Sequence, residues 1–377
     1  MSYRRTKAVL IKEFRHIIRD KRSLSLALAM PAMMLLLYGF ALSLDVDHIP
    51  MMVYDQDGTE TSRTLTRQFE GSRFFNVNEK VGDYREVDRG IDRGDVLIAL
   101  VIPHDFGKDV AAARGATVQI IVDGSDSNTA GIAIGYAEGV LQTYAMAVKA
   151  EVLNLRGMKM PPPPVAAQTR VWYNSSLQSK NFVVPGLIAV ILMILTGQLT
   201  TLTIAREWEM GTMEQILSTP LRPAEMVLGK MLAYFGIGLV DAVLSFVAAV
   251  TIFAVPFRGS LILLAVSTCI FLCGAMFWGI FISAGTRSQV QAYQLGMLTT
   301  FLPGFLLSGF VFSLDVMPKW IQLISVVVPS RYFVVILKAL FLKGVGWDVL
   351  WTQVVYLIIF GAIVFWRSVK KLNQKVA

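Results

Sequence analysis

The residues able to do chemistry in this chain of 377 residues form no recognisable enzyme motif. The sequence lacks the GxxxxGKS/T loop that cradles nucleotide phosphates, the GxSxG turn of serine hydrolases and the HExxH helix of zinc proteases. Its histidines are scattered, and Cys269 and Cys273 lie four residues apart in one apolar run, where they would share a helix face as packing residues. We therefore expect no catalytic residue, no metal site, no cofactor bound by this chain, and no enzyme activity of its own.

Charged side chains gather instead in one segment, residues 205–229, which reads AREWEMGTMEQILSTPLRPAEMVLG. Apolar runs long enough to cross a bilayer precede and follow it. A short polar helix between two spans is a contact site for a partner protein, to which Arg206, Glu207, Glu209 and Glu214 would offer charge. The alternative is an ordinary solvated loop helix. Pro220 would end this helix.

Composition sets the protein class. The chain is 54% hydrophobic and 16% charged, whereas a soluble domain carries about 25% charged residues. Its formal net charge of +8 comes from basic residues at the ends of apolar runs, which fits orientation in a membrane better than nucleic-acid binding. We expect an α-helical polytopic membrane protein in contact with the lipid bilayer, and no nucleic-acid partner.

The apolar pattern predicts six membrane spans. They are 23–44, 181–204, 226–253, 261–284, 290–312 and 347–366. Residues 315–346 are also apolar but are interrupted by Pro329, Ser330 and Arg331. A span there would put the basic tail, 367–377, outside, so we expect two re-entrant half-helices from the outer surface and both termini in the cytoplasm.

The composition changes abruptly between residues 45 and 180, where charges and turn residues are frequent. This stretch predicts a small α/β extracytoplasmic domain. The expected strands are 51–54, 95–102 and 117–122, and the expected helices are 59–69, 84–91 and 126–155. Pro161 to Pro164 would form a stiff spacer on the way back to the membrane.

The charged segment also carries a family resemblance. REWEMGTMEQILSTPLRPAEMVLGK resembles the stretch after the second span of ABC-2-type export permeases, and VPFRGS, LSGFVF and PSRYFVVILKALFLKG, which start at residues 255, 307 and 329, extend the similarity over essentially the whole chain. The chain is most similar to the multidrug export subgroup with a large extracytoplasmic domain after the first span. In this family a cytoplasmic coupling helix docks into an ATPase.

The resemblance implies an assembly in the bacterial inner membrane. Two permeases, identical or related, would form the pathway above separate P-loop ATPase subunits that bind ATP and Mg, and a periplasmic adaptor is a further expected partner. The residues implied in ATPase coupling are Arg206, Glu207, Glu209, Gly211, Thr212 and Glu214. Residues 205–225 would be the coupling helix and loop, and residues 1–22, with eight basic side chains, an amphipathic elbow helix that contacts the ATPase or only anchors the chain.

Three polar residues are candidates for the translocation path: Asp241, Gln198 and Gln294. A carboxylate midway along a span costs about 2.5 to 3.5 kcal/mol on insertion scales, so Asp241 should face a cavity or a partner. Either it lines the path and attracts a cationic substrate, or it bonds another helix through Gln291 or Gln294.

The expected function is an ATP-driven exporter of drug-like or cationic amphiphilic compounds. Lipid or polysaccharide export is the alternative within the family. From other classes, a membrane-anchored ligand-binding receptor would need a cytoplasmic signalling domain, and an ion-coupled secondary transporter would usually show internal repeats and several buried charges.

Overall fold

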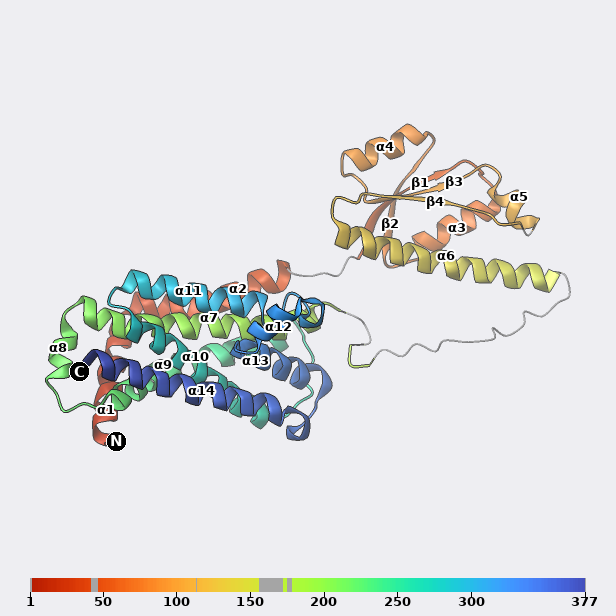
Figure 1. The fold of residues 1–377 in the computed structure, drawn as a ribbon. Coiled ribbons are helices and arrows are strands. Elements are labelled where there is room, and N and C mark those ends of the chain that lie inside the picture. The colour runs from red at the N-terminus through yellow and green to blue at the C-terminus, as the bar shows by residue number, and fades with distance from the viewer. Residues whose placement is uncertain (1, 42–46, 113, 156–171, 175–177, 377) are drawn as a thin grey trace. The chain divides into compact units, whose positions relative to one another are not determined.

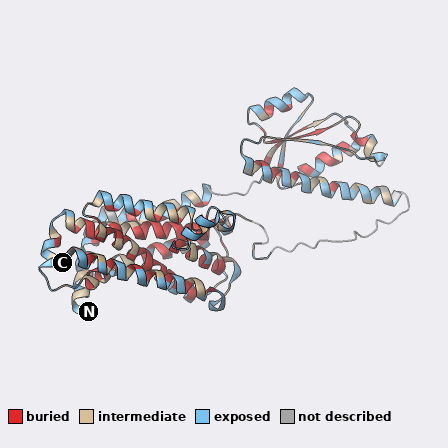
Figure 2. Ribbon diagram, viewed as in Figure 1, coloured by how far each residue is buried: buried red, intermediate tan, exposed pale blue. Residues whose placement is uncertain are grey.

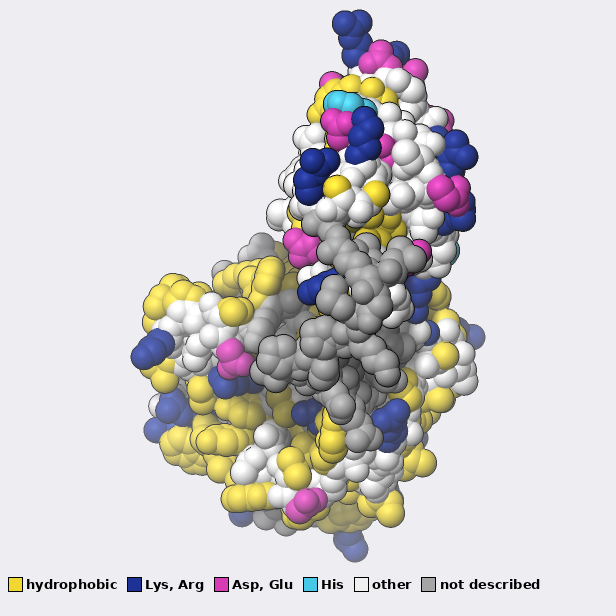
Figure 3. Space-filling model, turned by 90° about the vertical axis from the view of Figure 1, so that its right-hand side faces the viewer, with side chains coloured by type: hydrophobic (Ala, Val, Ile, Leu, Met, Phe, Trp, Pro, Cys, Tyr) yellow, Lys and Arg dark blue, Asp and Glu magenta, His cyan; other side chains and the backbone are white. Residues whose placement is uncertain are grey.

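The computed structural model describes residues 2–41, 47–112, 114–155, 172–174 and 178–376 (Figure 1). The chain divides into two compact units: Met1–Ser43 with Val171–Ala377, called the helical unit, and Leu44–Arg170, called the sheet unit. The expected spacer Pro161 to Pro164 lies outside the described residues. Broad hydrophobic surface covers the helical unit, whereas charged side chains are frequent on the sheet unit (Figure 3). This difference fits one unit in lipid and one in water.

The helical unit is built from ten α-helices among the described residues. They are α1 (Tyr3–Arg19), α2 (Lys21–Ala41), α7 (Lys180–Glu209), α8 (Thr212–Leu217), α9 (Pro223–Thr251), α10 (Leu261–Gly285), α11 (Gln289–Leu306), α12 (Lys319–Ser325), α13 (Pro329–Lys338) and α14 (Trp347–Val376). A 3-10 turn (Leu314–Val316) precedes α12, and a π turn (Ala339–Lys343) extends α13. Buried side chains concentrate along α7, which packs against α2, α9, α10, α11 and α13 (Figure 2).

Five helices among the described residues are long and apolar enough to cross a membrane: α2, α7, α9, α10 and α14. The chain is thus a multi-pass helical protein. A sixth span is counted only if α12 and α13 are taken together, and they are bent by 87°. This bend rules out one straight helix over 315–346. The expected span 290–312 corresponds to α11, which ends earlier, at Leu306, and is less apolar because Gln289, Gln291 and Gln294 occupy its first half.

The sheet unit contains a four-stranded sheet with the order β2-β1-β3-β4. Its strands are β1 (Ile49–Asp55), β2 (Phe75–Val81), β3 (Ile98–Ile102) and β4 (Gln119–Val122), and its helices are α3 (Glu60–Glu70), α4 (Tyr84–Asp92), α5 (Phe106–Ala111) and α6 (Ser127–Leu155). β1 runs parallel to β2 and β3, and β4 is antiparallel to β3. α3 and α6 cover one face of the sheet and α4 the other (Figure 1). Two α-helical layers around a mixed sheet give this unit a core of its own.

Candidate functional site

The charged segment is divided between two helices. α7 continues through Glu209, so Arg206, Glu207 and Glu209 lie on the last turns of the long helix rather than on a separate coupling helix. Gly211 then adopts φ of 71°, and α8 begins at Thr212. Left-handed backbone favours glycine, which explains why the chain breaks here. The coupling helix expected within residues 205–225 is corrected to two helices joined at Gly211.

Glu207 is buried, with 8% of its surface exposed, and its own chain binds its carboxylate. Lys12 on α1 and the hydroxyl of Thr212 both donate to it, and Lys230 on α9 lies 3.2 Å from its Oε1. A buried carboxylate needs such compensating donors. Glu207 thus has internal partners on α1, α8 and α9, and its expected contact with an ATPase stays a prediction.

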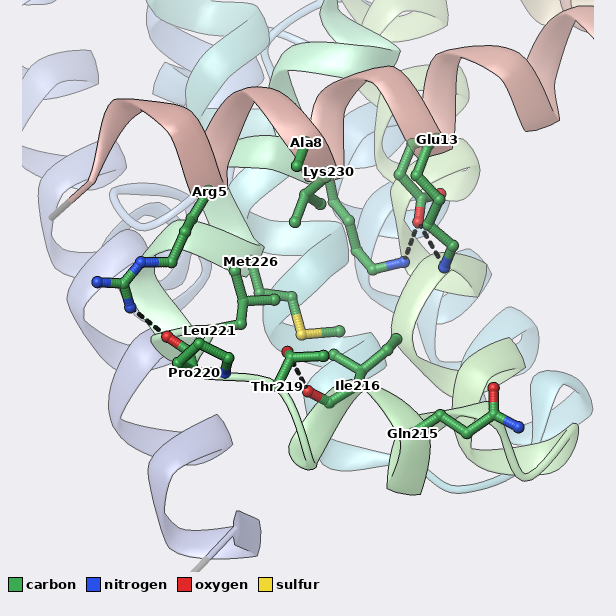
Figure 4. Close-up of a pocket in the computed structure, with 12 residues that line it drawn as sticks. Arg5, Ala8, Glu13, Gln215, Ile216, Thr219, Pro220, Leu221, Met226 and Lys230 are labelled. Carbon is green, nitrogen blue, oxygen red and sulfur yellow. Dashed lines mark hydrogen bonds and ion pairs between the residues drawn. The ribbon is translucent and has the colours of Figure 1, made fainter.

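Lys230 on α9 binds a second carboxylate, that of Glu13, in addition to Glu207. Its side chain is 1% exposed, and its Nζ lies 2.7 Å from Glu13 Oε1 (Figure 4). The same Nζ lies 3.2 Å from the carbonyl oxygen of Thr203. Lys12, Glu13, Glu207 and Lys230 together form a charge cluster that contains two acids and two bases. The cluster joins α1, α7 and α9 without a net charge.

The charges in this cluster act on Lys12. Burial lowers the pKa of Lys12, but the hydrogen bond to Glu207 and the charges of Glu13 and Glu207 outweigh burial and raise it above its ordinary value. Lys12 therefore stays protonated. Neither Glu13 nor Lys230 was expected at this site from the sequence. A lysine within the apolar run VLGKMLAY is the signal that a buried carboxylate must lie nearby.

A second set of contacts fixes the loop after α8 to the start of α1. Glu225 is fully buried and accepts hydrogen bonds from the backbone N of Ser2 (2.6 Å) and of Arg222 (3.1 Å). Arg5 lies 3.5 Å from Glu225 and donates to the carbonyl oxygen of Pro220 (Figure 4). Between α1 and this loop lies a pocket of about 350 Å³ whose lining includes Ile216, Leu221 and Met226. The loop after α8 is thus bonded to α1, whereas Met213 of α8 itself packs in a core shared with α7, α9 and α10.

The remaining charged candidates are more exposed. Arg206 contacts His16 Nε2 at 2.9 Å and donates to Gln289 Oε1 at 3.3 Å, and the Glu209 carboxylate accepts from the backbone N of Gln289 at 2.6 Å. Glu214 is exposed on α8, and its carboxylate has no ion pair or hydrogen bond within the described part of the chain. Of the expected coupling carboxylates, Glu214 is the one left available to a partner.

The candidates for the translocation path do not converge. Asp241 is fully buried, and neither of its carboxylate oxygens has a hydrogen-bond donor in the described structure. Gln291 and Gln294 are exposed on α11, so the expected bond from Asp241 to either of them is absent. The side-chain oxygen of Gln198 on α7 is likewise buried without a donor. Asp241 and Gln198 thus have buried oxygens without a hydrogen-bond donor among the described residues.

Gln198 also lines an elongated groove of about 560 Å³ between α1, α2, α7 and α9. One part of the groove is apolar, with Leu24, Met30, Leu199 and Ile237 among its lining residues. The other part is charged and is lined by Lys12, Glu13, His16, Asp20, Arg206 and Glu207. The groove therefore combines surface suited to an apolar body with surface suited to a polar headgroup.

Comparison with known proteins decides the family. A family model described as ABC-2 family transporter protein matches residues 21–370. The chain belongs to the ABC-2 transporter family. It is 35% identical over 360 residues to the probable multidrug ABC transporter permease YbhS of Escherichia coli (strain K12), covering 95% of this chain and 94% of the relative.

Two further relatives match almost the whole length of this chain. The probable multidrug ABC transporter permease YbhR of Escherichia coli (strain K12) is 29% identical over 374 residues, covering 99% of this chain and 100% of the relative. The inner membrane transport permease YhhJ of the same strain is 28% identical over 378 residues, covering 97% and 96%. The family matches include the sheet unit as well as the membrane helices, so the ABC-2 assignment applies to both.

Proposed function

We propose that this ABC-2 protein is the membrane-spanning permease subunit of an ATP-binding cassette exporter. Separate P-loop ATPase subunits would bind ATP and Mg, and a second permease, identical or related, would complete the pathway. The observation that carries the proposal is α8, a short helix between α7 and α9. Its Met213 is buried in the core shared with α7, α9 and α10, whereas its Glu214 is exposed. A helix held on one side and charged on the other is suited to docking a soluble partner.

The charge cluster connects α8 to the helices α1, α7 and α9. Thr212, the first residue of α8, donates to Glu207, whose carboxylate is shared with Lys12 and Lys230. A displacement of α8 by an ATPase therefore acts on α1, α7 and α9 together. Buried ion pairs have strict geometry, because separating either charge leaves the other unpaired in an apolar environment. The cluster would thus transmit the closure of the ATPase as a concerted movement of three helices.

The arrangement of helices supports a cytoplasmic position for α8. Both ends of the chain lie near α1 and α8, at the end of the helical unit opposite α12 (Figure 1). Basic side chains are frequent there, among them Arg4, Arg5, Arg367 and Lys370, as the positive-inside rule requires of the cytoplasmic side. We infer that both termini are cytoplasmic in a bacterial inner membrane. The sheet unit, inserted between α2 and α7, would then lie outside, where a periplasmic adaptor is a candidate partner.

α11 is the proposed sixth span. Its first residue, Gln289, is bonded to Glu209 at the coupling end, and α12 follows it at the opposite end. Its 18 residues extend about 27 Å, close to the roughly 30 Å of a bilayer core. With α11 crossing and α12 to α13 re-entrant, six spans return the chain to the cytoplasm.

The proposed substrates are drug-like or cationic amphiphilic compounds. The groove lined by Gln198 supports this class, since it joins an apolar wall to a charged end. Asp241 supports a cationic group, because its buried oxygens lack donors. Gln294, exposed on α11, would face the path where the two permeases meet. The names of the relatives YbhS and YbhR, probable multidrug permeases, agree with this substrate class.

Mild-detergent purification of tagged protein from its native membrane, followed by mass spectrometry, tests the proposal. We expect a P-loop ATPase at about one copy per permease, and the same experiment would reveal whether a second permease is present. Loss of the ATPase in Glu214→Arg would locate the contact on α8. If gentle crosslinking captured no ATPase, the exporter would be excluded in favour of an ion-coupled transporter with Asp241 as its proton site.

A further inference from the structure

The sheet unit contains a helix that is much longer than the sheet it covers. α6 has 29 residues and is about 43 Å long, whereas the strands have four to seven residues. Ala133 and Ala137, in its first half, are buried in the core shared with the strands. Its second half extends past the sheet alongside α3 and α5 (Figure 1). The strands therefore do not cover the second half of α6, which forms one wall of a pocket.

A pocket of about 530 Å³ lies between that wall and the segment that joins α5 to β4. Its base is formed by Leu65, Phe106 and Tyr144, all buried. The Tyr144 hydroxyl donates to the carbonyl oxygen of Thr61 at 3.1 Å, and its ring stacks on that of Phe106 with centroids 6.4 Å apart. These contacts hold the aromatic base in place, so the pocket does not depend on a loosely packed side chain.

The walls of the pocket are aliphatic and its rim is basic. The walls comprise Val110, Ala116, Val118, Leu141, Val148 and Leu153. Arg114 and Lys149 are the charged residues that line it. Arg114 is paired with Asp109 at 3.0 Å, whereas Lys149 has no ion pair or hydrogen bond anywhere in the described residues. One cation at the rim is therefore free to bind an anion.

We propose that this pocket binds a small amphiphile with an apolar body and one acidic headgroup, as in a fatty acid. Its volume lies in the range of small-ligand sites, which combine apolar walls with a few polar groups that orient the ligand. Lys149 would bind the acid directly, and Arg114 adds positive potential beside it. A cationic amphiphile would meet the unpaired positive charge of Lys149 instead. The site is separate from the groove of the helical unit and stands whether or not the proposed exporter function holds.

Photolabelling of the full chain in lipid nanodiscs tests the site. The probe is a palmitic acid that carries a diazirine, and the adducts are mapped by mass spectrometry after digestion. We expect adducts on peptides from Val110 to Val118 and from Leu141 to Leu153, displaced by unlabelled palmitate but not by hexadecylamine. Adducts on the membrane helices, which any bilayer-dissolved fatty acid produces, serve as the internal reference.

Three variants test the site, and photolabelling is the readout for all of them. Ala145 is exposed and lines the pocket, so Ala145→Trp would fill it without disturbing the core, whereas Met146→Trp places the same ring on exposed surface that does not line it. Ala145→Trp should abolish labelling and Met146→Trp should not. Lys149→Glu should reduce labelling about fivefold, as expected for loss of an exposed ion pair. Labelling that survives Ala145→Trp, or equal competition by hexadecylamine, would overturn the proposal.

Discussion

Lys230 Nζ lies 2.7 Å from Glu13 Oε1, although the two residues are 217 positions apart in the sequence. This pair joins α1, which precedes the first span, to α9, which follows the coupling region. Both side chains are buried, and Glu207 is the second carboxylate within reach of the same ammonium group. The contact therefore unites the three segments that meet beneath α8.

Removal of one member of this pair should destabilise the protein strongly. Lys230→Met leaves two buried carboxylates with Lys12 as their remaining cation, and breaking a buried pair costs about 3 to 5 kcal/mol. Glu13→Gln with Lys230→Gln should recover part of the loss, because no charge is left unpaired between α1 and α9. Titration with sodium dodecyl sulfate in mixed micelles measures the free energy of unfolding. Lys7→Met, which removes an exposed cation from α1, should change it by less than about 0.5 kcal/mol.

The carboxylates expected to couple the ATPase should separate into two classes. Glu207→Ala should lower stability, because it removes the shared partner of Lys12 and Lys230. Glu214→Ala should leave stability unchanged yet uncouple ATP hydrolysis from export, because the side chain is exposed and free. Unfolding and substrate-stimulated ATPase activity are measured on the same preparations. Glu86→Ala, an exposed acid on α4, is the control; normal coupling in Glu214→Ala would refute the assignment.

Gly211 should be sensitive to backbone conformation rather than to side-chain size. A Cβ atom at this position would meet nothing within 4 Å, but φ is 71°. Gly211→Ala should therefore cost about 1 to 2 kcal/mol in the left-handed region, while Gly211→Asn should be tolerated better because asparagine visits that region. We expect the order Gly, Asn, Ala in coupled ATPase activity. Equal activity of the Ala and Asn variants would show that the break between α7 and α8 does not matter.

Asp241→Asn tests whether the buried carboxylate selects cations. The change keeps the shape of the side chain and removes its charge. Export of a cationic substrate should fall about tenfold, the effect of losing about 1.4 kcal/mol of attraction, while export of a neutral one should stay the same. Protein yield and oligomeric state should be unchanged, since neither oxygen of Asp241 accepts a hydrogen bond in the described structure. An equal loss for both substrates would point to a packing role.

Membrane helices were the most predictable part of the fold. The expected spans 181–204 and 261–284 correspond to α7 and α10 because bilayer thickness fixes the length of an apolar helix. The end of α11 was less predictable. The apolar run continues to residue 312, but the backbone leaves the helix after Leu306, and Gly309 adopts φ of 74°. Composition alone does not reveal that change.

Edge strands and long-range contacts escaped sequence reasoning. β2 reads FNVNEKV, and Phe75 is its one fully buried residue, so the strand carries little apolar signal at the edge of the sheet. The burial of Glu207 depends on Lys12 and Lys230, which approach from other helices. Its local sequence, REWEMG, looks like a solvated helix end. The spacing of residues within this segment could not show that the charge of Glu207 is neutralised by Lys12 and Lys230.

α7 has one further mechanical consequence. It runs without a break from Lys180, where the chain returns from the sheet unit, to Glu209, beside α8, over about 45 Å. A continuous helix resists bending and twisting, so a displacement at one end of α7 is passed on to its other end. In the proposed exporter, a ligand bound at one end of α7 would change the affinity for the ATPase at the other end, and this coupling of binding free energies must be equal in both directions.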